Sequence, residues 1–300
     1  MKIEEKFNGM RIDSVVPLIN EQISRSLAQS LIKDGKILLN GKCVKVSSKV
    51  FTNDDIFIPE NTEKEVNEEL VAEEIPLDII YEDDDIVVVN KPKDMVVHPA
   101  VGNRSGTLVN AMLGHSELSD INGEFRPGIV HRLDKNTTGA LVIAKTNFAH
   151  NNIAKQIQDR KTKKIYLALV RGIIKEDNGV IKMPIGRHPV DRKKMAVVRD
   201  GKEAHTNFKV LKRFEEGYTL IEVELKTGRT HQIRVHMSHI GYPIVGDDVY
   251  SSGKNPFGVT SQMLHAKILG FVHPTKNEYM EFEAPIPKEF EEVIKGLREI

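Results

Sequence analysis

The sequence predicts an α+β fold, with a mixed and mostly antiparallel sheet in a larger domain and a small module of helices and a hairpin before it. Three observations support this prediction. Several apolar, β-branched runs follow residue 77, helical patterns lie between them, and a strongly acidic stretch separates them from the N-terminal segment. We therefore place the small domain at residues 1–60, an acidic linker at 61–76 and the larger domain at 77–300.

The composition indicates a soluble globular protein. Of the 300 residues, 40% are hydrophobic and 29% are charged. No run approaches the roughly 20 apolar residues of a membrane-spanning helix, and the first residues lack the apolar core of a signal peptide. Cys43 is the only cysteine, so an internal disulfide is excluded and a structural zinc site lacks paired thiols. We expect a cytoplasmic protein.

Charge is unevenly distributed along the chain. Basic and acidic residues are equal in number, at 43 each. Residues 61–85 nevertheless hold eleven acidic side chains and one lysine, whereas residues 86–300 hold 33 basic and 24 acidic ones. This asymmetry fits an anionic partner such as a nucleic acid, but charge alone favours a solvated linker beside an ordinary basic surface.

Two short helices are expected near the N-terminus. Apolar residues at helical spacing predict the first over residues 12–19. The second is expected to begin at a serine cap, Ser24 or Ser26, and to end at Gly35.

A hairpin should follow these helices, with a strand at residues 37–39, a turn at Asn40-Gly41 and a return strand at Val44, because Asn-Gly tolerates the positive φ angles of a two-residue turn. Basic side chains fall along one edge of this segment: Arg25, Lys33, Lys36 and Lys42. The arrangement resembles the αL RNA-binding fold, which presents a basic helix edge to RNA. The alternative is a small α+β module with solvated lysines.

Residues 61–76 carry much negative charge and few large apolar side chains, so we expect an extended tether. Beyond it, two apolar runs flank a charged turn and the second run stops at Pro92. Further strands are expected at 139–145, 164–170, 206–211 and 218–225. Helical patterns fit residues 108–113, 149–160, 230–240 and 287–299.

The most informative segment is GIVHRLDKNTTGALVIAKT, residues 128–146. A strand end is expected to deliver Asp134 into a turn, and a second apolar strand leads away. Such a loop can hold a carboxylate at the rim of a cleft. The spacing alone supports equally an Arg132–Asp134 pair that only ties the turn.

Four segments in order resemble the motifs of the RluA family of pseudouridine synthases. They are HRLDKNTTG (131–139), VNKPKDMVVHP (89–99), KKIYLA (163–168) and LKTGRTHQIRVH (225–236). The resemblance implies that Asp134 is the catalytic aspartate, that Tyr166 contacts the target base and that Arg234 pairs with Asp134. Together with the αL-like module, it points to RluD-like members, which modify large-subunit ribosomal RNA.

The same resemblance suggests further contacts with RNA. Arg132 would brace the space left by an unstacked base, and Ile233 would form part of the pocket floor. The other implied residues are His131 and Arg229 for the substrate and Lys163 and Lys164 for the RNA backbone. Without the motifs, Tyr166 and Ile233 would be read as ordinary core residues.

The reaction breaks the bond between ribose C1′ and uracil N1 and joins C1′ to C5, so nothing is added or lost. We therefore expect no cofactor and no metal, and the sequence contains no phosphate loop or metal-ligand spacing. An aspartate can act as a nucleophile at C1′ or C6, or as a base, and the sequence does not choose among these routes. Alternative functions are modification of another RNA such as transfer RNA, a non-catalytic RNA chaperone, and a glycoside hydrolase, which would need a second carboxylate.

Overall fold

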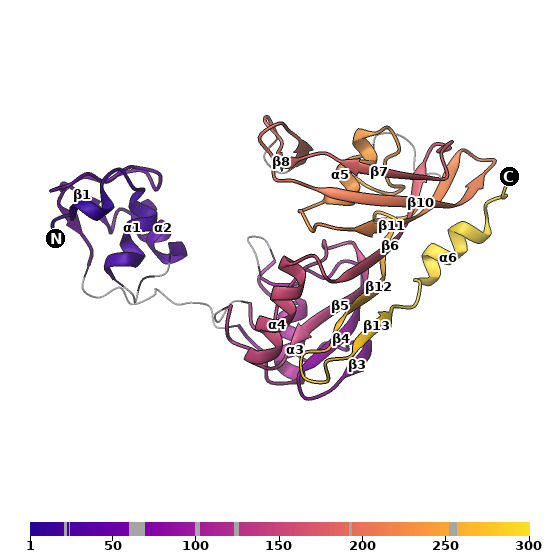
Figure 1. Ribbon diagram of the computed structural model, residues 1–300, viewed down its shortest axis with the longest axis horizontal. Helices are drawn as coiled ribbons and strands as arrows, with labels where there is room; N and C mark the ends of the chain where they lie inside the picture. The colour runs from indigo at the N-terminus through magenta and orange to yellow at the C-terminus, as the bar shows by residue number, and fades with distance from the viewer. Residues whose placement is uncertain are drawn as a thin grey trace. The chain divides into compact units, whose positions relative to one another are not determined.

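The computed structural model describes residues 1–20, 23, 25–59, 70–99, 103–122, 126–191, 194–251 and 257–300. The chain forms two compact units, Met1–Glu69 and Leu70–Ile300 (Figure 1). Most of the predicted acidic linker, at 61–69, lies outside the described residues. Each unit has its own hydrophobic core.

The N-terminal unit is built from short elements: the 3₁₀ helix η1 (Glu5–Phe7), α1 (Ile12–Ile19), α2 (Arg25–Lys33), β1 (Leu38–Leu39) and β2 (Ile56–Phe57). Both predicted helices are confirmed, and Gly35 follows the second with a φ of 70°. Ser26 is inside α2 and does not cap it, whereas Ser24 lies outside the described residues.

The predicted Asn-Gly turn is present, but the predicted return strand is wrong. Asn40 and Gly41 have φ angles of 51° and 71°, and backbone hydrogen bonds of 3.0 Å join Leu39 and Lys42 in both directions. Beyond that single bridge, β1 pairs antiparallel with β2 and not with the segment around Val44. Ile56 of β2 is fully buried, so β2 is the strand that covers the core. This pairing was not predicted because β1 and β2 are far apart in the sequence.

The C-terminal unit contains most of the strands. They are β3 (Ile79–Glu82), β4 (Ile86–Lys91), β5 (Thr138–Ala144), β6 (Lys163–Arg171), β7 (Asn178–Lys182), β8 (Ile185–Arg187), β9 (Met195–Val197), β10 (His205–Phe214), β11 (Tyr218–Leu225), β12 (Leu264–Val272) and β13 (Tyr279–Glu283). Among the described residues, nine of them form one sheet in the order β3-β4-β5-β12-β6-β11-β10-β7, with β13 beside β12 (Figure 1). Only β5 and β12 run parallel within this described sheet, so the predicted mixed, mostly antiparallel sheet is confirmed.

The central strand β12 was not predicted from the sequence. It lies between β5 and β6, and it contributes Leu264 and Ala266 to one core and Leu269 and Phe271 to another. A strand buried on both faces lacks the alternation of apolar and polar residues that reveals a half-buried strand. The short strands β7, β8, β9 and β13 were missed as well.

Helices cover both faces of the β4–β5 end of the sheet. The helices of this unit are α3 (Leu108–His115), α4 (Asn147–Gln158), α5 (Gln232–His239) and α6 (Lys288–Lys295), close to the four predicted ones. Val87 and Val89 of β4 share a core with α3, whereas Ile86 and Val88 share a core with α4. Alternate residues of a strand point to opposite faces, so α3 and α4 lie on opposite faces of the sheet.

Helix α5 lies on the same face as α3, because Ile233 and Met237 join the core that contains Val87. Helix α6 packs Phe290 against Leu167 and Leu169 of β6, on the other face. No helix in the described part of the chain combines the length and the apolar character needed to cross a bilayer.

Residues 70–76 belong to the C-terminal unit, which corrects the predicted end of the linker. Leu70 and Ile75 pack against its core. The side chain of Asn110 donates to the carbonyl of Val71 at 2.8 Å, and Glu73 accepts from the backbone of Gly106 at 2.9 Å. Two apolar side chains and backbone pairing are enough to hold this acidic segment on α3.

Candidate active site

The turn that carries Asp134 is held by packing at both ends. Leu133 is buried in the core, and the backbone N–H of Thr137 donates to the carbonyl of Asp134 at 3.1 Å. Gly139 has a φ of 115°, and a Cβ there would lie 2.2 Å from the carbonyl oxygen of Ala266 on β12. The glycine that ends the motif is therefore required by the close approach of β12.

Arg234, in the first turn of α5, joins the Asp134 turn to a loop after that helix. Its Nη1 donates to Oδ2 of Asp134 at 3.2 Å. Its Nε and Nη2 donate to the two oxygens of Asp247 at 2.7 and 2.9 Å. Asp247 also accepts the backbone N–H groups of Val249 and Tyr250, both at 3.0 Å, so its position is determined from two sides.

One buried guanidinium is thus shared by two carboxylates. Burial alone would lower the pKa of Arg234, but the hydrogen bonds and charges of Asp247 and Asp134 raise it well above its usual value. The side chain of Asp247 is fully buried, whereas that of Asp134 is 17% exposed. Asp134 is consequently the carboxylate that a ligand can reach, and a carboxylate beside a guanidinium can act as a nucleophile or a base.

Asp134 lies in a small cavity of about 100 Å³. Predicted site residues from the Asp134 turn, from β6, from the loop before α5 and from α5 itself line it together: Arg132, Asp134, Tyr166, Arg229, Ile233 and Arg234. Tyr166 and Ile233 are buried and form walls, while Arg132 is exposed. Burial raises the pKa of the Tyr166 hydroxyl, and the charge of Asp134 raises it further.

The part of the sequence that carries this site matches a known family. A family model described as RNA pseudouridylate synthase covers residues 85–239, just over half of the chain and all the lining residues between Arg132 and Arg234. The chain belongs to the RNA pseudouridylate synthase family. A model of the S4 domain matches residues 10–56, which confirms the RNA-binding type of fold predicted for the N-terminal unit.

Relatives of this pseudouridylate synthase align along nearly its whole length. An uncharacterised RNA pseudouridine synthase of Bacillus subtilis is 46% identical over 98% of this chain and 96% of its own. The ribosomal large subunit pseudouridine synthase D of Pseudomonas aeruginosa is 42% identical over 98% of this chain and 94% of its own. Among solved structures, human RNA pseudouridylate synthase domain containing 1 is 27% identical with a TM-score of 0.56, covering 75% of this chain and 97% of its own.

Three of the predicted contacts of this pseudouridylate synthase lie elsewhere. His131 is not among the residues that line the cavity. Its Nε2 accepts the backbone N–H of Val142 at 3.0 Å, and burial lowers its pKa to about 3. Lys163 pairs with Glu281 of β13 at 2.8 Å, and Lys164 is partly exposed, with burial lowering its pKa. The assignment of these three side chains to substrate and RNA contact stays a prediction.

Two buried residues at the site were missed from the sequence, Asp247 and Lys91. Lys91, at the end of β4, donates to the carbonyls of Pro92, Met95 and Lys135 at 2.7, 2.8 and 2.9 Å. Burial lowers the pKa of Lys91 to about 7. Because Lys135 follows Asp134 directly, this amine ties the Asp134 turn to β4. A lysine inside an apolar run, as in VVVNK, was the signal that could have revealed it.

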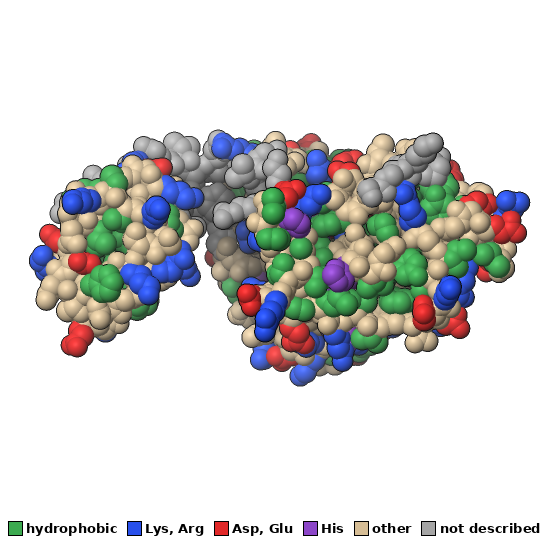
Figure 2. All heavy atoms as spheres, turned by 90° about the horizontal axis from the view of Figure 1, so that it is seen from above, with side chains coloured by type: hydrophobic (Ala, Val, Ile, Leu, Met, Phe, Trp, Pro, Cys, Tyr) green, Lys and Arg blue, Asp and Glu red, His purple; other side chains and the backbone are tan. Residues whose placement is uncertain are grey.

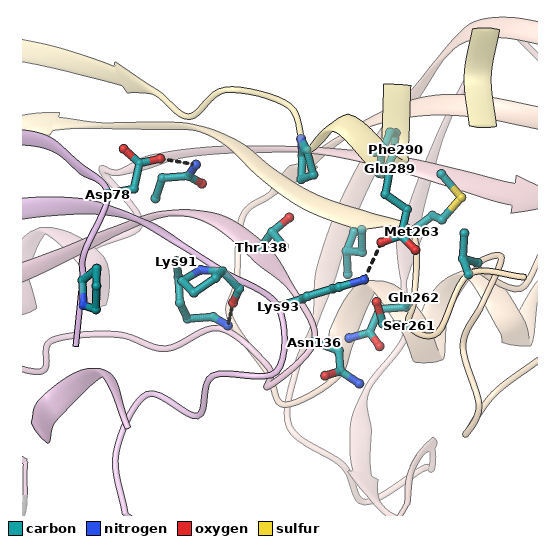
Figure 3. A pocket seen from close by; sticks show the side chains of 16 residues that line it. Asp78, Lys91, Lys93, Asn136, Thr138, Ser261, Gln262, Met263, Glu289 and Phe290 are labelled. Carbon is teal, nitrogen blue, oxygen red and sulfur yellow. Dashed lines mark hydrogen bonds and ion pairs between the residues drawn. The ribbon is translucent and has the colours of Figure 1, made fainter. Parts of the chain in front are cut away.

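A larger cavity of about 480 Å³ adjoins the same turn (Figure 3). Asn136 and Thr138 line it, whereas Thr137 between them lines the smaller cavity. Its acidic side chains are engaged, because Glu289 pairs with Lys93 at 2.6 Å and Asp78 accepts from the Asn90 amide at 2.8 Å. The chemistry of the side chains, not the volume, therefore makes the smaller cavity the candidate reaction site.

The predicted basic edge of the S4 domain is exposed to solvent. This holds for all four of its members: Arg25, Lys33, Lys36 and Lys42. Lys and Arg side chains are prominent on the face of this unit in Figure 2. Arg25 is also oriented by the buried Asp13, to which it donates at 3.1 and 3.2 Å. Asp13 in turn accepts from Arg11 at 2.8 Å and from the Gln29 amide at 2.8 Å.

Proposed function

We propose that this enzyme isomerises uridine to pseudouridine in large-subunit ribosomal RNA and that Asp134 is the group that reacts. The observation that carries the proposal is the pair formed by Asp134 and the buried Arg234 in a cavity lined by Tyr166. Membership of the RNA pseudouridylate synthase family and the presence of an S4 domain support it.

The reaction requires a free oxygen on the carboxylate. The C1′–N1 bond breaks, a C1′–C5 bond forms, and the proton on C5 is replaced by one on N1. Whether Asp134 attacks C1′, attacks C6 or removes a proton, an oxygen with a free lone pair must face the nucleoside. Arg234 occupies Oδ2, so Oδ1 is the oxygen left to react.

Tyr166 suits contact with the base better than proton removal. Its ring lines the cavity and offers a flat apolar face to an unstacked uracil. Because burial and the nearby Asp134 raise the pKa of its hydroxyl, the phenol stays neutral at ordinary pH. We therefore assign Tyr166 to stacking and hydrogen bonding, and the C5 proton must leave by another group.

The size and depth of the cavity support base flipping. A uridine stacked in a helix cannot reach a buried wall such as Tyr166, so the nucleotide must turn out of its stack, at a cost of a few kcal/mol. Arg132 lines the same cavity and its side chain is exposed. A guanidinium at that position can stack in the space that the base leaves.

A non-catalytic RNA binder does not explain this arrangement. Arg234 lies between two carboxylates, so its charge is neutralised within the protein and cannot neutralise a phosphate. A glycoside hydrolase is disfavoured as well, because Asp134 is the one acidic side chain among the described residues that line the cavity.

Large-subunit ribosomal RNA is the substrate that the relatives favour. Several proteins aligned over nearly the whole chain carry the name ribosomal large subunit pseudouridine synthase D, including the one from Pseudomonas aeruginosa. Mapping of pseudouridines in ribosomal and transfer RNA, from cells with and without the active protein, checks this choice. Loss of sites only in transfer RNA would refute it.

The assignment of Asp134 is tested by Asp134→Asn, which keeps the shape of the side chain and removes its charge. We expect the rate of pseudouridine formation in a single turnover to fall by at least about 10³-fold, with RNA affinity changed less than about twofold. The exposed Asp200→Asn is the matched control and should retain full activity. An active Asp134→Asn enzyme would contradict the proposal.

A further inference from the structure

His231 occupies an unusual backbone position at the rim of the reaction cavity. It precedes α5 directly and has a φ of 57° and a ψ of 21°, in the left-handed region that non-glycine residues seldom adopt. Its side chain makes no capping hydrogen bond to the helix. Instead it lines the cavity that contains Asp134. A strained conformation that turns a side chain into a reaction cavity points to a role for that side chain.

Tyr250 is hydrogen-bonded to one of the two ring nitrogens of His231. The Tyr250 hydroxyl lies 2.8 Å from Nδ1 of His231, and it accepts the backbone N–H of Met195 on β9 at 2.9 Å. In the tautomer in which the Tyr250 hydroxyl donates to Nδ1, the imidazole carries its own proton on Nε2.

The protonated nitrogen faces the catalytic carboxylate. Nε2 of His231 lies 3.9 Å from Oδ1 of Asp134, while Oδ2 is hydrogen-bonded to Arg234 at 3.2 Å. The two oxygens of Asp134 therefore have different surroundings. At 3.9 Å the nitrogen lies beyond hydrogen-bond distance of Oδ1, so the two groups interact only electrostatically and the oxygen keeps its lone pairs for the nucleoside.

We propose that His231, set by Tyr250, is a positioning residue that aligns Oδ1 of Asp134 for reaction with the target uridine. The proposal rests on the proposed function, since it assumes that Asp134 reacts. It adds two side chains, outside the aspartate, tyrosine and arginine already assigned, and it names the oxygen that reacts.

Neutral His231 is the active form. Burial lowers the pKa of His231 below its usual value, which the charges of Asp134 and Asp247 oppose and those of Arg234 and Arg132 reinforce. Protonation at acid pH would place a second cation against Asp134. Both oxygens would then be held in ion pairs, and Oδ1 would lose its freedom to react.

The first test separates the hydrogen-bond donor from the ring. His231→Phe keeps the ring shape without the donor, and we expect the single-turnover rate at saturating RNA to fall about 10- to 100-fold, with RNA affinity within about twofold. His231→Gln restores an N–H donor and cannot be protonated, so it should recover most of the rate. Thermal melting of both variants checks that α5 remains folded.

The pH profile gives a readout that a purely structural role would not change. The wild-type rate should fall as the pH drops below the ordinary histidine pKa of about 6.5, because His231 becomes charged in that direction. His231→Gln should lose less of its rate over the same range. Identical profiles for the two proteins would overturn the proposal.

The second test is a double-mutant cycle with Tyr250→Phe. If the hydroxyl acts through the imidazole, Tyr250→Phe should slow the wild-type enzyme about 3- to 10-fold and have no further effect on His231→Phe. Ser238→Ala is the matched control for the backbone of Tyr250, because it removes the 2.9 Å hydrogen bond to the Tyr250 carbonyl and leaves the hydroxyl and the imidazole unchanged. Independent, multiplying effects of the two variants would contradict the proposal.

These experiments distinguish the two proposals from each other. An active Asp134→Asn enzyme removes the proposed function and with it the role of His231. An inactive Asp134→Asn enzyme beside a fully active His231→Phe enzyme leaves the proposed function in place and rejects the role of His231 alone.

Discussion

At the scale of single residues, the carboxylate that we propose to react depends on a side chain that does not line the cavity around Asp134. Asp134 is oriented by Arg234, and Arg234 is held through two hydrogen bonds by Asp247. Planar guanidinium geometry makes this possible, because one fork binds Asp247 while the remaining nitrogen reaches Asp134. A lysine at this position would supply the charge, but it lacks the planar fork that binds Asp247 and Asp134 at the same time.

This arrangement predicts a strong effect of Asp247→Asn. The variant leaves Arg234 buried beside a neutral amide, so we expect the free energy of unfolding to fall by about 3–5 kcal/mol. The single-turnover rate should fall about 10- to 100-fold, since Arg234 no longer holds Oδ2 of Asp134 in place. Urea unfolding and single-turnover kinetics measure the two effects.

The neighbouring Asp248→Asn provides the control. Its side chain is largely exposed and lies 4.0 Å from Arg234, so stability and rate should stay near those of the wild type. Equal behaviour of Asp247→Asn and Asp248→Asn would show that the buried pair does not position Arg234.

At the scale of elements, buried charged groups join segments that packing alone would leave loose. Lys91 joins the end of β4 to the Asp134 turn by donating to three carbonyl oxygens. In the S4 domain, Asp13 on α1 accepts from Arg25 and Gln29 on α2. The first connection positions Asp134, and the second positions Arg25 on the basic edge.

The second connection predicts the effect of Asp13→Asn. Hydrogen bonds from Arg11, Gln29 and Arg25 lower the pKa of Asp13 well below its usual value, against the effect of burial. We expect the variant to lower the stability of the N-terminal unit by about 1–3 kcal/mol at neutral pH. Hydrogen exchange of the α1 amides measures this loss.

The pH dependence follows from the sign of the shift. Because the pKa of Asp13 is lowered in the folded state, its contribution is complete above the unfolded value of about 3.9 and is lost as pH falls toward the folded value. The difference between wild type and Asp13→Asn should therefore shrink below about pH 4. A difference that stays constant into strong acid would argue against the ionic connection.

At the scale of the whole molecule, we propose that RNA affinity and the chemical step belong to different units. The S4 domain carries an exposed basic edge and the catalytic unit carries the Asp134 cavity. Contacts of lysines with phosphates release counterions and depend on salt, whereas chemistry on a bound uridine does not.

The double variant Lys33→Gln, Lys42→Gln tests this division. We expect weaker RNA binding and a salt dependence of log affinity that is shallower by about one to two units per decade of salt concentration. The single-turnover rate at saturating RNA should be unchanged. Filter binding across a salt series measures the affinity of the double variant. Asp134→Asn, with normal affinity and no activity, is expected to show the opposite pattern. A double variant with unchanged salt dependence would remove these lysines from the RNA interface.

Local patterns in the sequence were sufficient for much of the fold. Helical spacing located α1 and α2, and apolar runs bounded by turn residues located β4, β5 and β11. The motif around Asp134 indicated the reaction only through its resemblance to the RluA family, because its spacing alone fits equally an Arg132–Asp134 pair that ties the turn. These features depend on neighbours within one turn or one strand, and such neighbours are visible in the sequence.

What the sequence by itself determined was therefore local conformation, the two-domain order and the residue types of the site. Only the tertiary structure decided which polar side chains meet: Asp247 with Arg234, Glu281 with Lys163, and Tyr250 with His231. It also placed β12 between β5 and β6, far from both in sequence. The reason is physical, since many carboxylates and hydroxyls of the chain are chemically equivalent, and long-range packing of the sheet and α5 selects the few that come within hydrogen-bond distance.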